Sequence, residues 1–186
     1  LHETGFGVLR NHPLDQTMVE GIYAEWLAFF KTEAKHAYAQ DPVKLDGYFS
    51  PSISETAKNN TKRDLKEFYH IYPAWGRYPT EVSNAAQRYH ALGSALAATL
   101  LSWVEENSPP EVKARYSMPL PQMIEGCYHT LLRVLHYPPL RGDEEPGAVR
   151  AAAHGDINLL TILPAATEPG LQVLGKDGAW FDVPCD

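Results

Sequence analysis

The spacing of apolar residues changes near Thr130, and this change constrains the fold more than any other feature of the 186-residue sequence. Before it, apolar residues recur at steps of three and four over residues 14–38 and 80–107, which predicts two amphipathic helices. After it, short apolar runs are separated by glycine and proline, which predicts strands. Helices followed by strands favour an α+β protein in which the helices pack outside a β-sandwich or barrel.

The two predicted helices have recognisable limits and apolar faces. Asp15 is the expected N-cap of the first helix, with Leu14 packing over it, and Asn107 with the prolines that follow it ends the second. The side chains expected to be buried are Met18, Ile22, Trp26, Phe29 and Phe30 in the first helix, and Tyr89, Leu92, Leu96, Leu100 and Trp103 in the second.

Strands are expected toward both ends of the chain. Residues 4–11 predict a short strand that a proline ends, and residues 130–139 predict another closed by two prolines. Further runs are expected at residues 150–156, 158–165, 170–174 and 179–184, with a Lys-Asp-Gly hairpin turn at residues 176–178. Residues 41–78 are expected to be irregular but ordered, because they combine Pro, Gly and Ser with many aromatic residues.

The composition argues against some classes of function. A formal charge of −7 disfavours a nucleic-acid or anionic-membrane surface, since both need clustered lysine and arginine. Two cysteines, Cys127 and Cys185, make no disulfide framework, and a reducing cytoplasm suits them. No apolar run approaches the roughly 20 residues that a membrane span requires.

His154 and Asp156 lie two residues apart, at the start of an apolar run. Alternate residues of a strand point to the same face, so both side chains are expected to reach one ion. An imidazole and a carboxylate suit Fe(II), and a second histidine would complete a facial triad that leaves positions open for oxygen and substrate. Chance produces such pairs easily, so the pair taken alone favours a hydrogen-bonded loop or surface pair.

The residues around the pair are more specific than the pair itself. After it come LTIL (160–163), GLQV (170–173) and DGAWFDVP (177–184). Before it come GFGVLRNHP at the start of the chain, a segment from Gly-Tyr to Asp-Leu-Lys-Glu at residues 47–67, and LLRVLHYPP at residues 131–139. In this order the motifs resemble the isopenicillin N synthase-like family of 2-oxoglutarate- and Fe(II)-dependent dioxygenases, over nearly the whole chain.

The resemblance implies a double-stranded β-helix, or jelly roll, with flanking N-terminal helices. Residues 1–117 would form the N-terminal helical region and residues 118–186 the first part of the jelly roll, within one structural unit. It also implies an enzyme that uses Fe(II), 2-oxoglutarate and dioxygen to oxidise a small molecule.

The family's site residues are carried over position by position. His154 and Asp156 match the first two iron ligands. Tyr137 matches the tyrosine that helps to hold 2-oxoglutarate, with a core tyrosine as the alternative, and Leu135 stands where the family has asparagine. Arg133, expected on the same face as Tyr137, is a second candidate for binding the cosubstrate, with a surface salt bridge as an equal alternative.

Other residues near these positions favour structural roles. His129 and His136 flank the strand, and a structural hydrogen bond is favoured for each over a place near the metal. The region of Tyr48 and Phe68-Tyr69 is expected to pack on the barrel rather than to line a substrate entrance.

Two expected parts of the site do not occur in the sequence. Neither a third histidine ligand nor the Arg-x-Ser that would grip 2-oxoglutarate follows His154. About five strands are expected from Thr130 onward, whereas a jelly roll needs about eight. We therefore expect the missing parts to lie beyond Asp186 and the isolated chain to be inactive. The alternatives are an oxidase that does not use 2-oxoglutarate and a non-catalytic jelly-roll scaffold.

Overall fold

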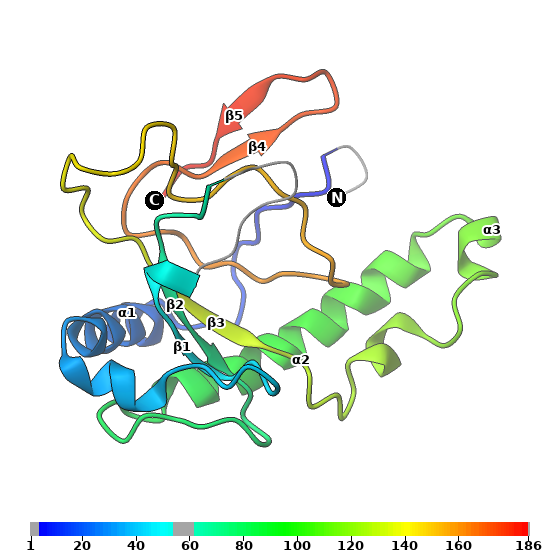
Figure 1. The fold of residues 1–186 in the computed structure, drawn as a ribbon. Helices are drawn as coiled ribbons and strands as arrows, with labels where there is room; N and C mark the ends of the chain where they lie inside the picture. The colour runs from blue at the N-terminus through cyan, green and yellow to red at the C-terminus, as the bar shows by residue number, and fades with distance from the viewer. Residues whose placement is uncertain (1–3, 54–61, 186) are drawn as a thin grey trace.

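The chain folds with α1 packed against one face of a small antiparallel sheet and the first half of α2 beside it (Figure 1). The structure is a computed structural model that describes residues 4–53 and 62–185. Its elements, in chain order, are α1 (Gln16–Phe30), η1 (Glu33–Tyr38), β1 (Gly47–Phe49), η2 (Pro51–Ile53), β2 (Glu67–Ile71), α2 (Ala85–Glu106), α3 (Pro110–Lys113), η3 (Leu120–Met123), β3 (Leu132–His136), β4 (Gln172–Leu174) and β5 (Trp180–Asp182). The architecture is α+β, as predicted.

The ends of α1 lie where side chains bond its unpaired backbone groups. Asp15 is the N-cap, as predicted, and its Oδ1 accepts a hydrogen bond from the backbone N–H of Thr17 at 3.2 Å. The helix ends at Phe30, earlier than predicted. There the hydroxyl of Thr32 donates to the carbonyl of Phe29, and the ammonium of Lys35 donates to the carbonyl of Phe30. The chain continues as the 3-10 turn η1.

The core lies between α1 and the sheet. Trp26 is 1% exposed, and its ring lies 5.2 Å from that of Tyr69, measured between centroids. The buried residues of α1 are Val19, Ile22, Trp26, Phe29 and Phe30, so its predicted face is confirmed except that Val19 is buried where Met18 was expected. Aromatic rings thus supply most of the contact between this helix and the strands.

β2 is the central strand of the sheet and is buried along its whole length. It pairs antiparallel with β1, where Tyr48 lies opposite Tyr69, and with β3, where Tyr69 lies opposite Val134. These three side chains share the face that meets α1. The opposite face carries Phe68, with Leu135 as its partner in β3.

The prediction that residues 41–78 are irregular is wrong, because β1 and β2 lie within them. β2 reads Glu-Phe-Tyr-His-Ile, and this run does not alternate between polar and apolar residues, since both faces of the strand are buried. The aromatic residues here are buried, since Tyr48 is 3% exposed and Phe68 and Tyr69 are 0% exposed, while their packing on a barrel stays a prediction.

α2 begins at Ala85 rather than at residue 80, and its predicted stripe is confirmed only in part: Tyr89 is buried and Leu96 packs against the core. Its buried residues are Ala86, Tyr89, Gly93 and Leu101, whereas Leu92 and Trp103 are 39% and 54% exposed. The buried stripe includes Ala86 and Gly93. The prediction missed these positions because it considered only large apolar side chains. No helix in the described part of the chain is long and apolar enough to cross a membrane.

Fewer strands form than the sequence predicts. Residues 4–11, 150–156 and 158–165 make no ladder with any other described segment, and a strand exists only where such a ladder forms. The predicted hairpin is confirmed, with β4 paired to β5. Its turn closes through a hydrogen bond from the N–H of Gly178 to the carbonyl of Gly175, and Gly178 has the positive φ that the turn requires.

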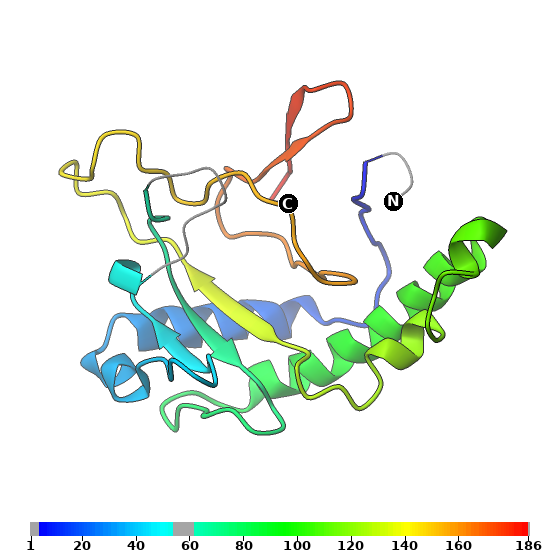
Figure 2. The same cartoon turned by 45° about the vertical axis from the view of Figure 1, so that its right-hand side comes forward.

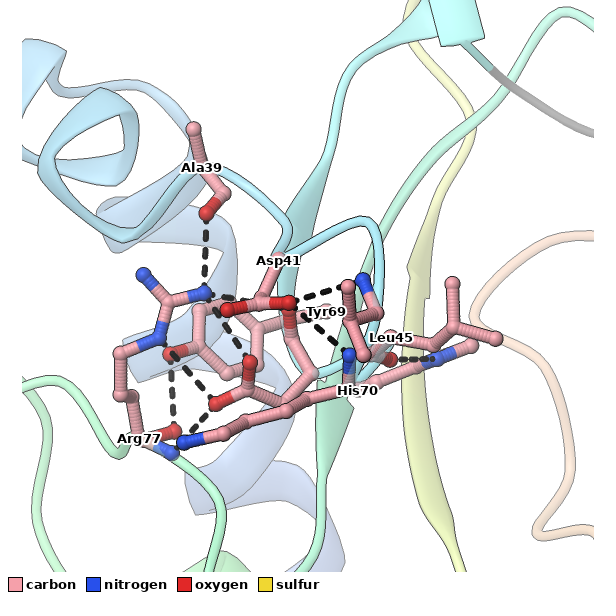
Figure 3. Close-up of polar contacts among 9 residues, drawn as sticks. Ala39, Asp41, Leu45, Tyr69, His70 and Arg77 are labelled. Carbon is pink, nitrogen blue, oxygen red and sulfur yellow. Dashed lines mark hydrogen bonds and ion pairs between the residues drawn. The ribbon is translucent and has the colours of Figure 1, made fainter.

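An ion pair between a buried aspartate and a partly exposed arginine joins the loop before β1 to the loop after β2, where Figure 3 shows Arg77. Asp46 is 2% exposed, and its Oδ2 accepts hydrogen bonds from the backbone N–H of Arg77 at 2.7 Å and from Nε at 3.1 Å. The Nη2 of Arg77 reaches Oδ1 of Asp46 at 3.1 Å and the carbonyl of Ala39 at 2.9 Å. Burial alone would raise the pKa of Asp46, but the hydrogen bonds and charge of Arg77 hold that pKa below its usual value.

Replacing Trp26 with alanine should lower the free energy of unfolding by about 3–5 kcal/mol, because removal of the ring leaves a cavity between α1 and the sheet. Denaturant titration followed by far-UV circular dichroism measures this loss. Trp103→Ala is the matched control, since that ring is 54% exposed and its loss should cost less than about 1 kcal/mol. Equal losses in the two variants would contradict the core described here.

Asp46→Asn should lower the free energy of unfolding at neutral pH by about 1–3 kcal/mol, because it removes charge-assisted hydrogen bonds to Arg77. The side chain of Arg77 is 43% exposed, so solvent screening favours the lower end of this range. The pKa of Asp46 is lowered by folding, so the carboxylate stabilises the fold above its ordinary pKa. This contribution is lost as the pH falls through the folded value.

The difference between wild type and Asp46→Asn should therefore shrink when the titration is repeated toward about pH 3. Asp143 is exposed, so Asp143→Asn should leave stability nearly unchanged at both pH values. A difference for Asp46→Asn that does not depend on pH would show that the ion pair is not its source.

Candidate metal site

Residues 149–165 contain His154 and Asp156 and are hydrogen-bonded at both ends to the helix-and-sheet body. Figure 2 shows this yellow-to-orange part of the chain as an irregular trace without helices or strands. At one end the carbonyl of Val149 accepts a hydrogen bond from the N–H of Leu65, just before β2. At the other end the carbonyl of Ala165 accepts one from the hydroxyl of Tyr23 in α1. Since the segment forms no ladder, the prediction that the pair lies on one strand is wrong.

The two side chains nevertheless turn toward each other. Nε2 of His154 lies 3.8 Å from Oδ1 of Asp156, and the side chains are 53% and 50% exposed. Two atoms that bind one ion at about 2.1 Å each lie no more than about 4.2 Å apart. The separation lies within this limit but exceeds the roughly 3 Å between neighbouring ligands of a facial triad, so binding of one ion would draw the two atoms closer together.

A backbone carbonyl sets the tautomer of His154. Nδ1 lies 2.7 Å from the carbonyl oxygen of Ala152. A carbonyl only accepts hydrogen bonds, so in the neutral ring Nδ1 carries the hydrogen and Nε2 keeps its lone pair. That lone pair lies on the nitrogen nearest Asp156. Metal-binding histidines are oriented in this way by a partner on the other ring nitrogen.

The carboxylate of Asp156 is oriented by a short hydrogen-bond chain. The amide of Asn158 donates to the hydroxyl oxygen of Thr161 at 3.0 Å, and that hydroxyl donates to Oδ2 of Asp156 at 2.5 Å. Oδ2 is thus occupied, and Oδ1 is the oxygen directed toward His154. The sequence pattern did not identify Thr161 or Asn158, although Thr161 lies in the quoted LTIL motif.

The pair provides two ligands, and a facial triad needs three. Within residues 4–53 and 62–185, no group of three or more His, Cys, Asp or Glu side chains is arranged to hold a metal ion. His129 is exposed. His136 has a structural partner, because its Nδ1 lies 2.7 Å from Oε1 of Glu67 and its ring stacks on Phe30.

Glu67 gathers a buried polar cluster on the face of the sheet that meets α1. Its Oε2 accepts hydrogen bonds from Lys35 at 2.8 Å and from Tyr48 at 2.5 Å, beside the contact with His136. Burial alone would raise the pKa of Glu67, but these three hydrogen bonds and the charge of Lys35 lower it. Burial and the neighbouring carboxylate raise the pKa of Tyr48. The sequence pattern did not reveal this cluster.

Arg133 lies on the opposite face of the sheet. Its Nε donates to Nε2 of His70 at 2.9 Å, and its guanidinium carbon lies 4.7 Å from the centre of the Phe68 ring. His70 therefore donates from Nδ1 to the carbonyl of Leu45, a contact visible in Figure 3. Tyr137 follows β3 directly and is 37% exposed. The structure thus places Arg133 on the β2–β3 sheet and Tyr137 at its end.

The chain is similar to known proteins over its whole length. Residues 1–95 match the family model described as the N-terminal region of non-haem dioxygenase in morphine synthesis. Gibberellin 2-beta-dioxygenase 4 of Arabidopsis thaliana is 26% identical over 195 residues, which cover 98% of this chain and 58% of that protein.

Two solved structures are also similar. A protein of Shewanella oneidensis, named provisionally as an oxygenase, is 54% identical with a TM-score of 0.86, covering 100% of this chain and 66% of its own. A protein of Caulobacter crescentus, assigned provisionally to the 2OG-Fe(II) oxygenase family, is 30% identical with a TM-score of 0.62, covering 96% and 60%. The chain thus spans less than two thirds of each of these three relatives.

The family model covers just over half of the chain, and the order of the sequence motifs agrees with it. The chain therefore belongs to the isopenicillin N synthase-like family of non-haem, 2-oxoglutarate- and Fe(II)-dependent dioxygenases.

Proposed function

We propose that the protein is an Fe(II)-dependent oxygenase that couples dioxygen and the decarboxylation of 2-oxoglutarate to the oxidation of a small molecule. The observation that carries this proposal is the facing pair of His154 Nε2 and Asp156 Oδ1, each oriented by a hydrogen bond to its other polar atom. Family membership and the similarity to the Caulobacter crescentus protein, which is assigned provisionally to the 2OG-Fe(II) oxygenase family, support the cosubstrate and the metal.

In this proposal His154 and Asp156 are two of the three iron ligands. His154 supplies a neutral nitrogen donor and Asp156 one negative charge, which together suit Fe(II) rather than a hard cation such as Mg²⁺. When bound, the metal supplies the redox chemistry that activates dioxygen. The protein's part is to orient the two ligands: the carbonyl of Ala152 places the hydrogen of the neutral imidazole on Nδ1, and the hydroxyl of Thr161 bonds Oδ2, so that Oδ1 faces His154. The third ligand is proposed to be a histidine outside the described residues.

The cosubstrate site is proposed from Arg133 and Tyr137. Both come from β3 or the residue after it, and Arg133 is held over Phe68 on the sheet face that points away from α1. A guanidinium suits a carboxylate of 2-oxoglutarate, and a phenol hydroxyl can donate to the same ligand. We propose that this face lines the inside of a jelly roll to which the β4–β5 hairpin also belongs.

The substrate is proposed to be a small molecule rather than nucleic acid or a membrane. The formal charge of −7 disfavours both of the latter partners. The free cysteines Cys127 and Cys185 suit a reducing compartment such as the cytoplasm.

His154→Ala and Asp156→Ala should each weaken Fe(II) binding by more than about 100-fold, since loss of a ligand costs more than the 10- to 100-fold of an outer contact. Anaerobic competition with a coloured chelator measures the affinity of the full-length protein. His129→Ala removes an exposed histidine and should leave the affinity unchanged. Stoichiometric iron in either ligand variant would show that the site lies elsewhere.

Anaerobic addition of Fe(II) and 2-oxoglutarate to the full-length protein should produce a visible metal-to-ligand charge-transfer band. The band reports chelation of the metal by the cosubstrate rather than binding of either alone. The His154→Ala variant should not give it. Iron bound without a band would favour an oxidase that does not use 2-oxoglutarate, and failure of the wild type to bind iron would favour a non-catalytic scaffold.

A further inference from the structure

Asp64 and Lys66 form a buried ion pair just before β2. Their side chains are 3% and 4% exposed, and Nζ lies 2.9 Å from Oδ2. Taking two charges out of water is costly, so such a pair by itself is weak evidence that it stabilises the fold. These residues belong to the Asp-Leu-Lys-Glu motif, to which the proposed function assigns no role.

The second carboxylate oxygen of Asp64 bonds the backbone two residues before His154. Oδ1 accepts a hydrogen bond from the N–H of Ala152 at 3.0 Å. The following residue, Leu65, donates its own N–H to the carbonyl of Val149 at 2.9 Å. The motif therefore grips the segment before His154 at two points on the backbone.

Ala152 connects this grip to the metal ligand. Its N–H is held by Asp64, and its carbonyl accepts the hydrogen bond from Nδ1 of His154. Ala152 thus links the buried carboxylate of Asp64 to the imidazole of His154. The tautomer of that imidazole determines whether Nε2 has a lone pair for a metal. The segment has no ladder of its own, so its position depends on contacts of this kind.

The last residue of the motif acts in a different place. Glu67 bonds Lys35, Tyr48 and His136 on the face that meets α1. Asp64 bonds the segment that carries His154 and Asp156. Lys66 lies 5.8 Å from the ring of Phe68, on the face of the sheet that points away from α1. The motif therefore joins the core on one side to the candidate metal site on the other.

We propose that Asp64 is a positioning residue for His154: by bonding the N–H of Ala152 it holds in place the carbonyl that accepts from Nδ1, so that the neutral ring presents the lone pair of Nε2 to the metal. Lys66 fixes the carboxylate so that Oδ1 meets the N–H of Ala152. This inference rests on the proposed role of His154 and Asp156 as metal ligands, but the tautomer of His154 can be measured without any metal.

The test compares wild type with Asp64→Ala in the full-length protein. Nitrogen-15 NMR of histidine-labelled, metal-free protein should show His154 as a single Nδ1–H tautomer in wild type and as a mixture in the variant. The signal is assigned by its loss in His154→Ala. Fe(II) affinity, measured anaerobically with a chelator, should fall about tenfold in Asp64→Ala, the low end for loss of an outer contact.

Two controls separate positioning from stability. Glu145→Gln removes the ion pair between the exposed Glu145 and Lys62, which lies near Asp64 in the sequence, and it should change neither readout. Glu67→Gln disturbs the opposite face and should lower the unfolding midpoint while leaving the tautomer intact. A tautomer mixture in Glu67→Gln would show that general loosening of the fold, rather than Asp64, governs His154.

Asp64→Asn keeps the shape of the side chain and removes its charge. It therefore tests the positioning role of Asp64 if Asp64→Ala does not fold. Its Fe(II) affinity should be reduced at least threefold, with a partial tautomer mixture, because a neutral acceptor bonds Ala152 less strongly. A native tautomer together with native affinity in every folded variant at Asp64 would overturn the proposal. Absence of Fe(II) binding in wild type would instead overturn the proposed function, and the tautomer comparison would still decide the role of Asp64.

Discussion

Burial of β2 on both faces is the constraint on which the rest of the structure depends. On one side Tyr69 packs against Trp26 of α1, and on the other Phe68 lies beneath the guanidinium of Arg133. A polar group buried in such a strand is costly unless it is hydrogen-bonded. Glu67 and His70 meet this requirement, the first with three partners from separate elements and the second with Leu45 and Arg133. These bonds also fix the relative positions of the elements that they join.

The candidate metal site depends on this rigid body without belonging to it. His154 and Asp156 lie on a segment without regular structure, as functional residues often do when a scaffold positions them. The scaffold holds the segment by single hydrogen bonds. A carboxylate oxygen of Asp64 accepts one from the N–H of Ala152, and the hydroxyl of Tyr23 donates one to the carbonyl of Ala165. A few hydrogen bonds, rather than pairing in a sheet, therefore fix the positions of His154 and Asp156.

The parts that could be predicted from the sequence are those with local physical causes. The N-cap at Asp15, the aromatic face of α1 and the glycine turn of the β4–β5 hairpin all follow from neighbouring residues. β2 could not be predicted in this way, because a central strand buried on both faces loses the alternation that marks a strand. The approach of His154 to Asp156 was expected, but from strand geometry, whereas a hydrogen bond from His154 to the carbonyl of Ala152 and one from Thr161 to Asp156 produce it. The contact of Asp64 with Ala152 spans 88 residues of sequence, and no local pattern encodes such a partner.

That separation has a consequence for local opening of the folded protein. Closing a loop of this length costs conformational entropy, which the contacts at the two ends of the segment offset. A segment held by few hydrogen bonds is expected to open more readily than β2, so its amide hydrogens should exchange earlier. A metal ion that binds only the docked segment would oppose this opening and slow the exchange.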